Sequence, residues 1–579
     1  MEIFQFDNSS YLGSVREVDT RKVTIQVNKD EDLRKAYVGH LVAIKQSGAA
    51  NGWLIAIIEK VTKSVVWENA SDTTEEHPDE DQYPEVEKVV NTVRVTLVGT
   101  LKWNVHDKQH KFSRSLVNVP EIESSCYILR GRHLEDFMNI LSVSSDYNYS
   151  LEFGKYTLDE KASAYLDGNK LFQRHAAVLG STGSGKSWTV ASILEQAAEL
   201  PSANLIVFDL HGEYRSLDYA THLRIPGPDE LGQSKAELLY LPYWLLNAEE
   251  LQAMFIDRSE FSAHNQVMAF QDAVIEQKRA FLEFTGKFEV LSAFTLDSPV
   301  PFSIDEVLRK LQFLNEEMEQ GARGLKQGKF YGQFSRLLTR MRSKISDNRY
   351  GFLFKAPPNE HKYESMALLA SKLMSFTGIT SKVKVIDFSE VPSDILPVII
   401  GLVARMIYQI QFWTQQEKRH PLAFICDEAH LYLPRKEGQN PVERRAIETF
   451  EKIAKEGRKY GVALMIVSQR PADVSTTVLS QCNNVIAMRL TNADDQSTVR
   501  KLMPESLEGL LDTLPILDTG EAMVVGDAVL LPSRIRVKPP MKQPLSSTIN
   551  FWTEWQKDVD DPDFMEAVEN MRRQRRLDS

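Results

Sequence analysis

The chain has 579 residues, of which 42% are hydrophobic and 26% charged, and this ordinary globular composition excludes general disorder, a collagen-like repeat and a disulfide-stapled miniature. At about 100–200 residues per domain, the length predicts roughly three to five folded units. The net charge of -12, from 68 basic and 80 acidic residues, argues against a wholly basic protein that coats nucleic acid. A basic channel inside an acidic shell remains compatible with that total.

The sequence predicts a soluble, cytoplasmic protein. Its most apolar stretch, Ile395 to Tyr408, is shorter than a membrane span and contains Arg405. The first residues, MEIFQFDNSS, are acidic where a signal peptide is basic and apolar. Because the three cysteines lie far apart, we expect neither a disulfide framework nor a zinc site.

Residues 1–150 are predicted to form an N-terminal β-barrel domain. Short apolar or alternating runs are separated by Asp, Asn and Gly turns, and they lie at 23–27, 41–44, 53–61 and 93–101. Without helical periodicity, such strands favour a small barrel. An acidic stretch at 68–88, which contains two prolines, is predicted to be a solvated hairpin insertion or a disordered loop.

From residue 151 onward the pattern changes to alternating strands and helices, which predicts an α/β fold with a mostly parallel sheet covered on both faces. The predicted strands are 176–180, 204–210, 383–388, 422–428 and 462–469, and the predicted helices between them include 188–200, 393–417 and 441–457. Residues 233–380 are predicted to be a helical insertion, with the run 236–246 among its helices. The expected domains are therefore core residues 151–232, insertion 233–380, core residues 381–540 and a C-terminal tail with one helix, 541–579.

The strongest motif is a glycine-rich loop with the pattern G-x-x-x-x-G-K-[ST]. It lies between a predicted strand and a predicted helix, as Gly180, Ser181, Thr182, Gly183, Ser184, Gly185, Lys186 and Ser187. Glycines let backbone N–H groups curl around phosphate oxygens, and the helix from Trp188 presents its positive end to the same anion. The motif predicts that Lys186 binds the β- and γ-phosphates of ATP and that Ser187 binds Mg²⁺.

An acidic pair follows a later strand, in the run Phe424 to His430. Asp427 is predicted to hold Mg²⁺ through water and Glu428 to activate the attacking water. Alone, the pair is equally typical of an acidic helix cap. Next to the phosphate loop, it favours hydrolysis of a nucleoside triphosphate.

Three further polar positions are candidates for the same site. Gln469, at the end of a buried strand, is a candidate γ-phosphate sensor, although a polar strand end before a proline turn is the alternative. Asp209 and Glu213 follow another strand, at the sheet edge where open α/β sheets bind ligands. Arg458 is either a surface residue or an arginine finger that enters the site of a neighbouring subunit.

The ordered set of motifs resembles the HerA family of the HerA/FtsK ring ATPases. The resemblance rests on the β-rich N-terminus and on residues 166–187, 208–214, 426–430, 456–461 and 468–475. It implies a RecA-like P-loop core behind a HAS-barrel, and a homohexamer that translocates double-stranded DNA with ATP. It further implies a separately encoded partner, a nuclease or an NAD-consuming effector, in DNA-end processing or antiphage defence. By the same resemblance, Gln469 is the sensor and Arg458 the finger.

Contact with DNA has weaker support. Two basic groups are candidates for the lining of a ring channel or for an ordinary solvated face: Arg340, Arg342 and Lys344, and Arg435, Lys436, Arg444 and Arg445. No base-reading helix is evident, so we expect binding without sequence specificity. Two other functions stay open: an ATP-binding scaffold that activates an effector with little translocation, and a ring ATPase that pumps protein.

Overall fold

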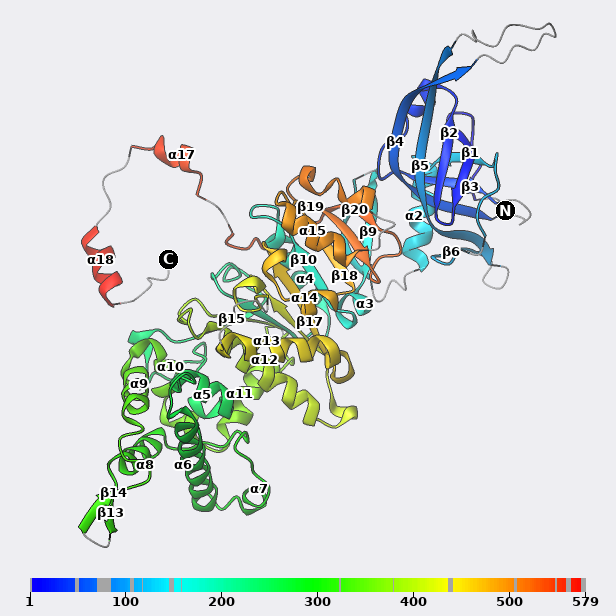
Figure 1. Cartoon of the computed structure of the whole chain (residues 1–579). Helices are drawn as coiled ribbons and strands as arrows, with labels where there is room; N and C mark the ends of the chain where they lie inside the picture. Colours follow the sequence, from blue (N-terminus) through cyan, green and yellow to red (C-terminus); the bar gives the residue numbers. More distant parts are fainter. Residues whose placement is uncertain are drawn as a thin grey trace, which may run out of the picture. The chain divides into compact units, whose positions relative to one another are not determined.

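A computed structural model divides the chain into two compact units (Figure 1). Unit 1 contains residues 1–193, 469–472 and 482–540, and unit 2 contains residues 194–468, 473–481 and 541–579. The structure describes residues 3–46, 52–69, 85–104, 109–116, 118–144, 150–157, 159–321, 324–378, 380–435, 441–503, 508–546, 549–558 and 564–573.

Unit 1 begins with the β-barrel that the sequence predicted. The strands pair in the order β2-β1-β7-β3-β4-β5, and an additional β2–β5 pairing closes the ring, with β6 attached to β5. The strands are β1 (Tyr11–Asp19), β2 (Lys22–Val27), β3 (Leu41–Lys45), β4 (Trp53–Asn69), β5 (Glu85–Asn104), β6 (Gln109–Ser113) and β7 (Ser125–Ile128). Burial alternates along β2, because inward side chains such as Val23, Ile25 and Val27 fill the barrel core.

Strands β4 and β5 extend beyond the barrel as a two-stranded ribbon (Figure 1). Their antiparallel register runs to the pair Asn69 and Glu85. The acidic stretch 68–88 therefore begins and ends on paired strands, and its middle, residues 70–84, lies outside the described residues. Helix α2 (Arg132–Ser144) follows the barrel.

The rest of unit 1 is a mixed set of strands around the glycine-rich loop. Strand β10 (Ala176–Leu179) pairs in parallel with β18 (Asn484–Ala487). Antiparallel pairing then continues the sheet in the order β18-β19-β20-β8-β9. The added strands are β8 (Ser150–Tyr156), β9 (Asp159–Asp167), β19 (Glu521–Gly526) and β20 (Ser533–Val537). The sequence did not predict this antiparallel extension.

Unit 2 contains five parallel strands in the order β12-β15-β11-β16-β17. They are β11 (Leu205–Asp209), β12 (Thr221–Arg224), β15 (Val383–Asp387), β16 (Leu422–Cys426) and β17 (Val462–Ser468). All residues of β11, β15, β16 and β17 are buried, as expected for parallel strands covered on both faces. Because these strands are parallel, the residues that follow them meet at one edge of the sheet.

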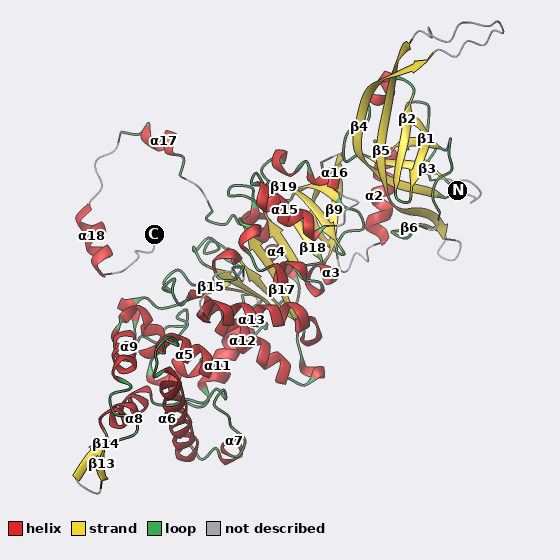
Figure 2. Ribbon diagram, in the orientation of Figure 1, coloured by secondary structure: helices red, strands yellow, loops and turns green. Residues whose placement is uncertain are grey.

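Helices α5 to α11 follow β12 in the chain and precede β15. The short β13–β14 hairpin stands at the tip of this group (Figure 2). They are α5 (Ala248–Phe255), α6 (Ala263–Phe284), α7 (Phe288–Leu291), α8 (Ile304–Glu316), α9 (Ser335–Ser346), α10 (Gly351–Phe354) and α11 (Ser365–Met374), and the hairpin is β13 (Met318–Gly321) with β14 (Gly324–Gln327). The predicted helix at 236–246 is wrong. Only a 3-10 turn, Tyr243–Leu245, forms there, because Pro242 has no N–H to donate within a helix.

Helix α12 (Leu396–Trp413) packs against α13 (Pro441–Glu456) in unit 2. The approach is close: a Cβ at Gly401 would lie 3.0 Å from the Cα of Ala446. Helix α12 is, among the described helices, the one long and apolar enough to cross a membrane, but 67% of its 18-residue window is buried inside the protein. Such burial is typical of a core helix.

The tail after residue 540 contacts the rest of unit 2 before its two short helices, α17 (Phe551–Trp555) and α18 (Phe564–Arg573). The Leu545 amide donates to the carbonyl of Glu213 at 2.6 Å, and Lys542 pairs with Asp218 at 2.5 Å. The predicted tail helix is present as α18.

Candidate functional site

The glycine-rich loop forms the turn between β10 and α4 (Lys186–Glu199) in unit 1. Gly183 and Gly185 adopt φ angles of +72° and +104°, which side chains with a Cβ rarely adopt. A Cβ at Gly180 would lie 2.8 Å from the Cβ of Met488, so this position also requires glycine. The loop's own backbone therefore explains Gly183 and Gly185, and the close approach of Met488 explains Gly180.

Lys186 occupies the centre of this loop. It is 8% exposed, and its Nζ donates to the Ser181 carbonyl at 3.2 Å. Because α4 begins at Lys186, the side chains of Ser187 and Trp188 belong to its first turn, where backbone N–H groups and the helix dipole attract an anion.

Three residues that the sequence did not single out support the loop from the segments that follow β18 and precede β19. The Ser181 amide donates to the Arg489 carbonyl at 2.8 Å, and the Gly520 amide donates to the Ser184 carbonyl at 3.0 Å. The Thr519 hydroxyl donates to the Gly183 carbonyl at 3.4 Å. These contacts hold the loop before any ligand binds, and no motif in a single sequence indicates them.

Gln469 lies against the same loop. The Thr182 hydroxyl donates to the Gln469 Oε1 at 2.5 Å. This contact fixes the amide so that its nitrogen, which can only donate, is available for an acceptor such as a phosphate oxygen. The structure thus brings together the loop and one of the residues predicted to act with it.

Asp209 ends β11 in unit 2 and organises the turn after it. Its Oδ1 accepts the amides of His211, Gly212 and Glu213 at 2.8–3.2 Å, and its Oδ2 accepts the Tyr214 amide at 3.0 Å. Burial raises the pKa of the Asp209 carboxyl, against the opposing effect of these amides. Both carboxylate oxygens are thus engaged by backbone, which fits a turn-forming role better than the predicted nucleotide contact.

The acidic pair follows β16, at the same edge of the unit 2 sheet. Burial raises the pKa of the Asp427 carboxyl well above its ordinary value, and the carboxylates of Glu428, Glu213 and Asp209 raise it further. The hydroxyl of Tyr214, which is fully buried, has no hydrogen-bond partner among the described residues. A cation and its water would relieve this accumulation of negative charge.

Glu428 has a strained backbone. Its φ of 45° and ψ of 42° lie in the left-handed region, which costs a residue with a side chain about 1–3 kcal/mol. Backbone strain of this kind is concentrated at functional sites. The turn leads directly into the short helix η7 (Ala429–Leu431).

Arg458 lies elsewhere, in the 3-10 helix η8 (Gly457–Tyr460) that precedes β17. Its side chain is exposed and has no ion pair or hydrogen bond with the described residues. The seven residues of β17 span about 20 Å at ~3.3 Å per residue. Arg458 is therefore at the edge of the unit 2 sheet opposite Asp427 and Glu428.

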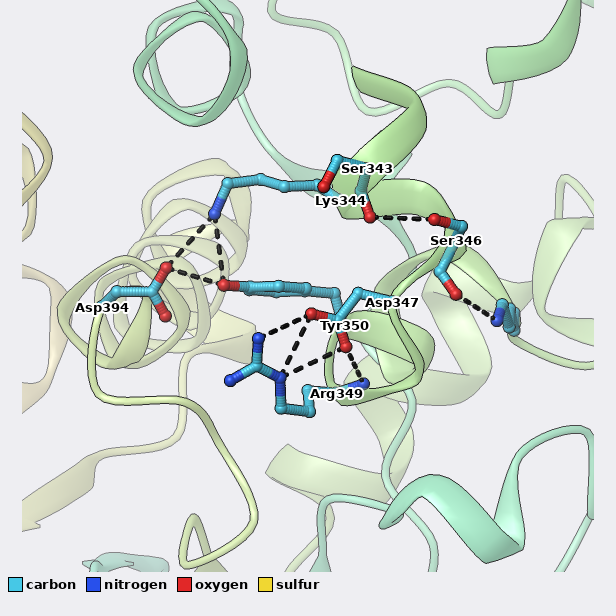
Figure 3. A network of polar contacts seen from close by, with 8 residues as sticks. Ser343, Lys344, Ser346, Asp347, Arg349, Tyr350 and Asp394 are labelled. Carbon is cyan, nitrogen blue, oxygen red and sulfur yellow. Dashed lines mark hydrogen bonds and ion pairs between the residues drawn. The ribbon is translucent and has the colours of Figure 1, made fainter. Parts of the chain in front are cut away.

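The basic groups are partly used in contacts within the chain. Figure 3 shows Lys344 pointing at Asp394, 3.2 Å away, and at the hydroxyl of Tyr350. Arg340 pairs with Glu260 at 2.6 Å, and Arg444 pairs with Glu448 at 3.3 Å. The side chains of Lys436 and Arg445 lie outside the described part of the chain.

A glycine turn between a strand and a helix, with Lys186 at its centre and Gln469 against it, defines a P-loop NTPase. Residues 151–407 match the family described as helicase HerA, central domain, and residues 402–550 match helicase HerA-like C-terminal. The chain belongs to the helicase HerA family.

Its curated relatives include the DNA double-strand break repair helicase HerA of Pyrococcus furiosus, which is 24% identical over 88% of this chain and 86% of its own length. The protein of the same name from Saccharolobus solfataricus is 26% identical over 67% of this chain and 68% of its own. Among solved structures, VirB4 of Thermoanaerobacter pseudethanolicus is 17% identical with a TM-score of 0.42, covering 67% of this chain and 96% of that one. The conjugative coupling protein TrwB is 13% identical with a TM-score of 0.44, covering 71% and 93%.

Proposed function

We propose that this protein hydrolyses ATP to translocate double-stranded DNA, as a ring-shaped helicase of the HerA type. The observation that carries the proposal is the contact of Gln469 with the P-loop, because it places an amide donor beside the loop predicted to bind the phosphates. Membership of the family, together with the name of the relatives as DNA repair helicases, supports DNA as the substrate.

In this proposal, the loop Gly180–Ser187 binds ATP through its backbone amides, and Lys186 neutralises the β- and γ-phosphates. The hydroxyl of Ser187 and the carboxylate of Asp427 offer the hard oxygen ligands that Mg²⁺ prefers. The buried Asp427 carboxyl and the Tyr214 hydroxyl, which finds no hydrogen-bond partner in the described part of the chain, fit a cation and its water at this edge. When bound, Mg²⁺ would neutralise charge that develops on the phosphates.

Hydrolysis needs a base and a sensor. We assign Glu428 to the attacking water as general base, and Gln469 to the γ-phosphate through its amide nitrogen. Asp209 is assigned to shaping the turn that presents Glu213 on the same sheet edge as Asp427 and Glu428. Asp209 thus holds the backbone of the turn. The other three predicted acidic residues, Glu213, Asp427 and Glu428, are assigned to the ATP site.

Arg458 supports assembly as a ring. It stands at the sheet edge opposite the acidic group, at a distance that no arginine side chain bridges, so a role at an ATP site requires the site of another copy. Exposed Trp413, 80% accessible, lies in the same region, where Phe412 packs on Tyr460 of η8. Exposed aromatic and arginine side chains are typical of interface centres. We propose a homohexamer with head-to-tail contacts.

We further propose that DNA is bound through its phosphates without reading of sequence, and that the partner is a separately encoded nuclease or NAD-consuming effector. DNA-end processing and antiphage defence are the two settings that fit. Of the basic residues, Arg435 is exposed and is a candidate for the channel lining. Arg340 and Lys344 are held in ion pairs within the chain.

The test is ATP turnover with and without duplex DNA, on the wild-type protein and on Lys186→Ala and Glu428→Gln. We expect DNA to stimulate turnover, Lys186→Ala to lose nucleotide binding, and Glu428→Gln to bind ATP without hydrolysing it. Turnover that DNA leaves unchanged would favour a protein pump. Effector activation that survives Glu428→Gln would favour the ATP-binding scaffold.

A further inference from the structure

His430 lies between Glu428 and the end of β17. Its Nδ1 is 3.3 Å from the Oε2 of Glu428 and 3.3 Å from the Oγ of Ser468. The side chains of Glu428 and His430 are 12% and 11% exposed, and Ser468 is fully buried. One imidazole nitrogen therefore contacts both a carboxylate and the neighbouring strand.

The chemistry of the two partners fixes the proton on the imidazole. A carboxylate oxygen can only accept, so an attractive contact with Glu428 needs a hydrogen on Nδ1. At 3.3 Å the two atoms lie within ion-pair distance rather than in a hydrogen bond. The Ser468 oxygen faces the same N–H and can accept from it as well. When the imidazole is protonated, it and the Glu428 carboxylate attract each other as an ion pair, and burial of both side chains weakens the screening by solvent.

The backbone makes this contact possible. The left-handed conformation of Glu428 turns the chain away from the direction of β16. His430 follows only two residues later, within η7. The Leu431 amide donates to the Glu428 carbonyl at 2.9 Å, which closes the turn. His430 thus reaches back to the side chain of the residue that starts its own turn.

We propose that His430 is a positioning residue that holds the Glu428 carboxylate for attack by water, with Ser468 supporting it from β17. The inference rests on the proposed ATP hydrolysis. Fixing one carboxylate oxygen sets the plane of the whole carboxylate, on which the transfer of a proton from water depends. Because Ser468 directly precedes Gln469, the same contact joins the proposed base to the strand that carries the proposed sensor.

The experiment compares steady-state ATP turnover, with duplex DNA, in His430→Ala, His430→Asn and His430→Gln. In His430→Ala, kcat should fall about 10- to 100-fold, because misplacement of a catalytic group by about 1 Å costs that much. KM for ATP and the affinity for a non-hydrolysable ATP analogue should change less than about twofold, because the substitution leaves the contacts with the phosphates intact. The side-chain nitrogen of Asn stands near the position of Nδ1, so His430→Asn should recover most of kcat, whereas the longer His430→Gln should not.

His264→Ala is the matched control, since His264 is exposed on α6 and far along the chain from the site. It should keep wild-type kcat. Ser468→Ala should lower kcat less than His430→Ala does, and the double variant should be no slower than His430→Ala alone, because both changes loosen the same carboxylate.

The outcomes distinguish a failure of the proposed ATP hydrolysis from a failure of the role of His430. No ATP turnover by assembled wild-type protein with DNA would overturn the proposed function itself. Wild-type turnover that His430→Ala leaves unchanged would overturn only the role of His430. Equal rescue of kcat by Asn and Gln would show that the role of His430 does not depend on the Nδ1 contact. Fully additive effects of Ser468→Ala and His430→Ala would show the same. The Asn and Ser468→Ala variants keep the inference testable where His430→Ala fails to fold.

Discussion

The hydroxyl of Thr182 and the side-chain oxygen of Gln469 lie 2.5 Å apart although 287 positions separate them in the chain. The contact joins the phosphate-binding loop to the residue that follows β17. It holds the Gln469 amide beside the loop and leaves the amide nitrogen to donate elsewhere, so its loss should affect turnover more than binding.

Replacing Gln469 by Ala should therefore lower kcat roughly 100-fold, the usual cost of removing one positioned donor, with little change in KM for ATP. Steady-state kinetics checks this. Thr182→Ser, which retains the hydroxyl, is the matched variant and should stay close to wild type, whereas Thr182→Val should resemble Gln469→Ala. A rise in KM alone would contradict a sensor role.

Arg458→Ala should abolish hydrolysis and spare nucleotide binding, because the guanidinium acts on the triphosphate of a neighbouring copy. Mixing Arg458→Ala with Lys186→Ala subunits should restore part of the turnover, since some interfaces then pair an intact loop with an intact arginine. If Arg458 acted on the ATP of its own subunit, mixing these two variants would restore no turnover. Lys459→Ala, which removes the adjacent exposed cation, serves as the control and should keep its activity.

Asp209→Asn should loosen the turn 210–214, because an amide has one accepting oxygen where the carboxylate has two. The Nδ2 group would also face the Tyr214 amide, donor against donor. We expect a local loss of about 1–3 kcal/mol. Hydrogen exchange of the amides of residues 211–214 measures it directly. Glu213→Ala should leave these amides protected, and equal protection in Asp209→Asn would contradict the assignment.

Stability should depend on pH through Lys278, which is 1% exposed in α6 and donates to the carbonyls of Leu296 and Ser298. Burial lowers its pKa to about 8 from 10.5. Between these values the unfolded chain binds the proton and the folded chain does not, so this residue's contribution to stability increases as pH rises from about 8 to about 10.5.

Over that interval the change should approach about 3 kcal/mol, at roughly 1.4 kcal/mol per pKa unit. The measurement is the difference in unfolding free energy between wild type and Lys278→Met across pH 7 to 11, which cancels all other titrating groups. A difference that stays flat across this range would show that the lysine titrates normally.

The parallel strands of unit 2 were accessible from sequence because each is a short run of buried apolar residues. β11, β15, β16 and β17 lie within or close to their predicted ranges. The apolar spacing at 236–246 predicted a helix that does not form, because Pro242 lacks the N–H that a helix requires at that position. Strands β8 and β20 carry mixed burial patterns without a strong periodic signal, and it is long-range pairing that joins them with β9 and β19 into one sheet.

The phosphate loop could be predicted from the motif alone, because the order of its glycines and Lys186 specifies a local backbone geometry. That acidic residues follow the strands could be predicted as well, because strand ends are local features. Three contacts became visible in the folded chain alone: backbone amides occupy Asp209, Thr182 meets Gln469, and His430 turns back to Glu428. The Thr182–Gln469 contact depends on which strand ends adjoin, and the His430 contact depends on the left-handed backbone of Glu428. The Asp209 contacts depend on how the chain turns after β11, which the motif alone does not specify.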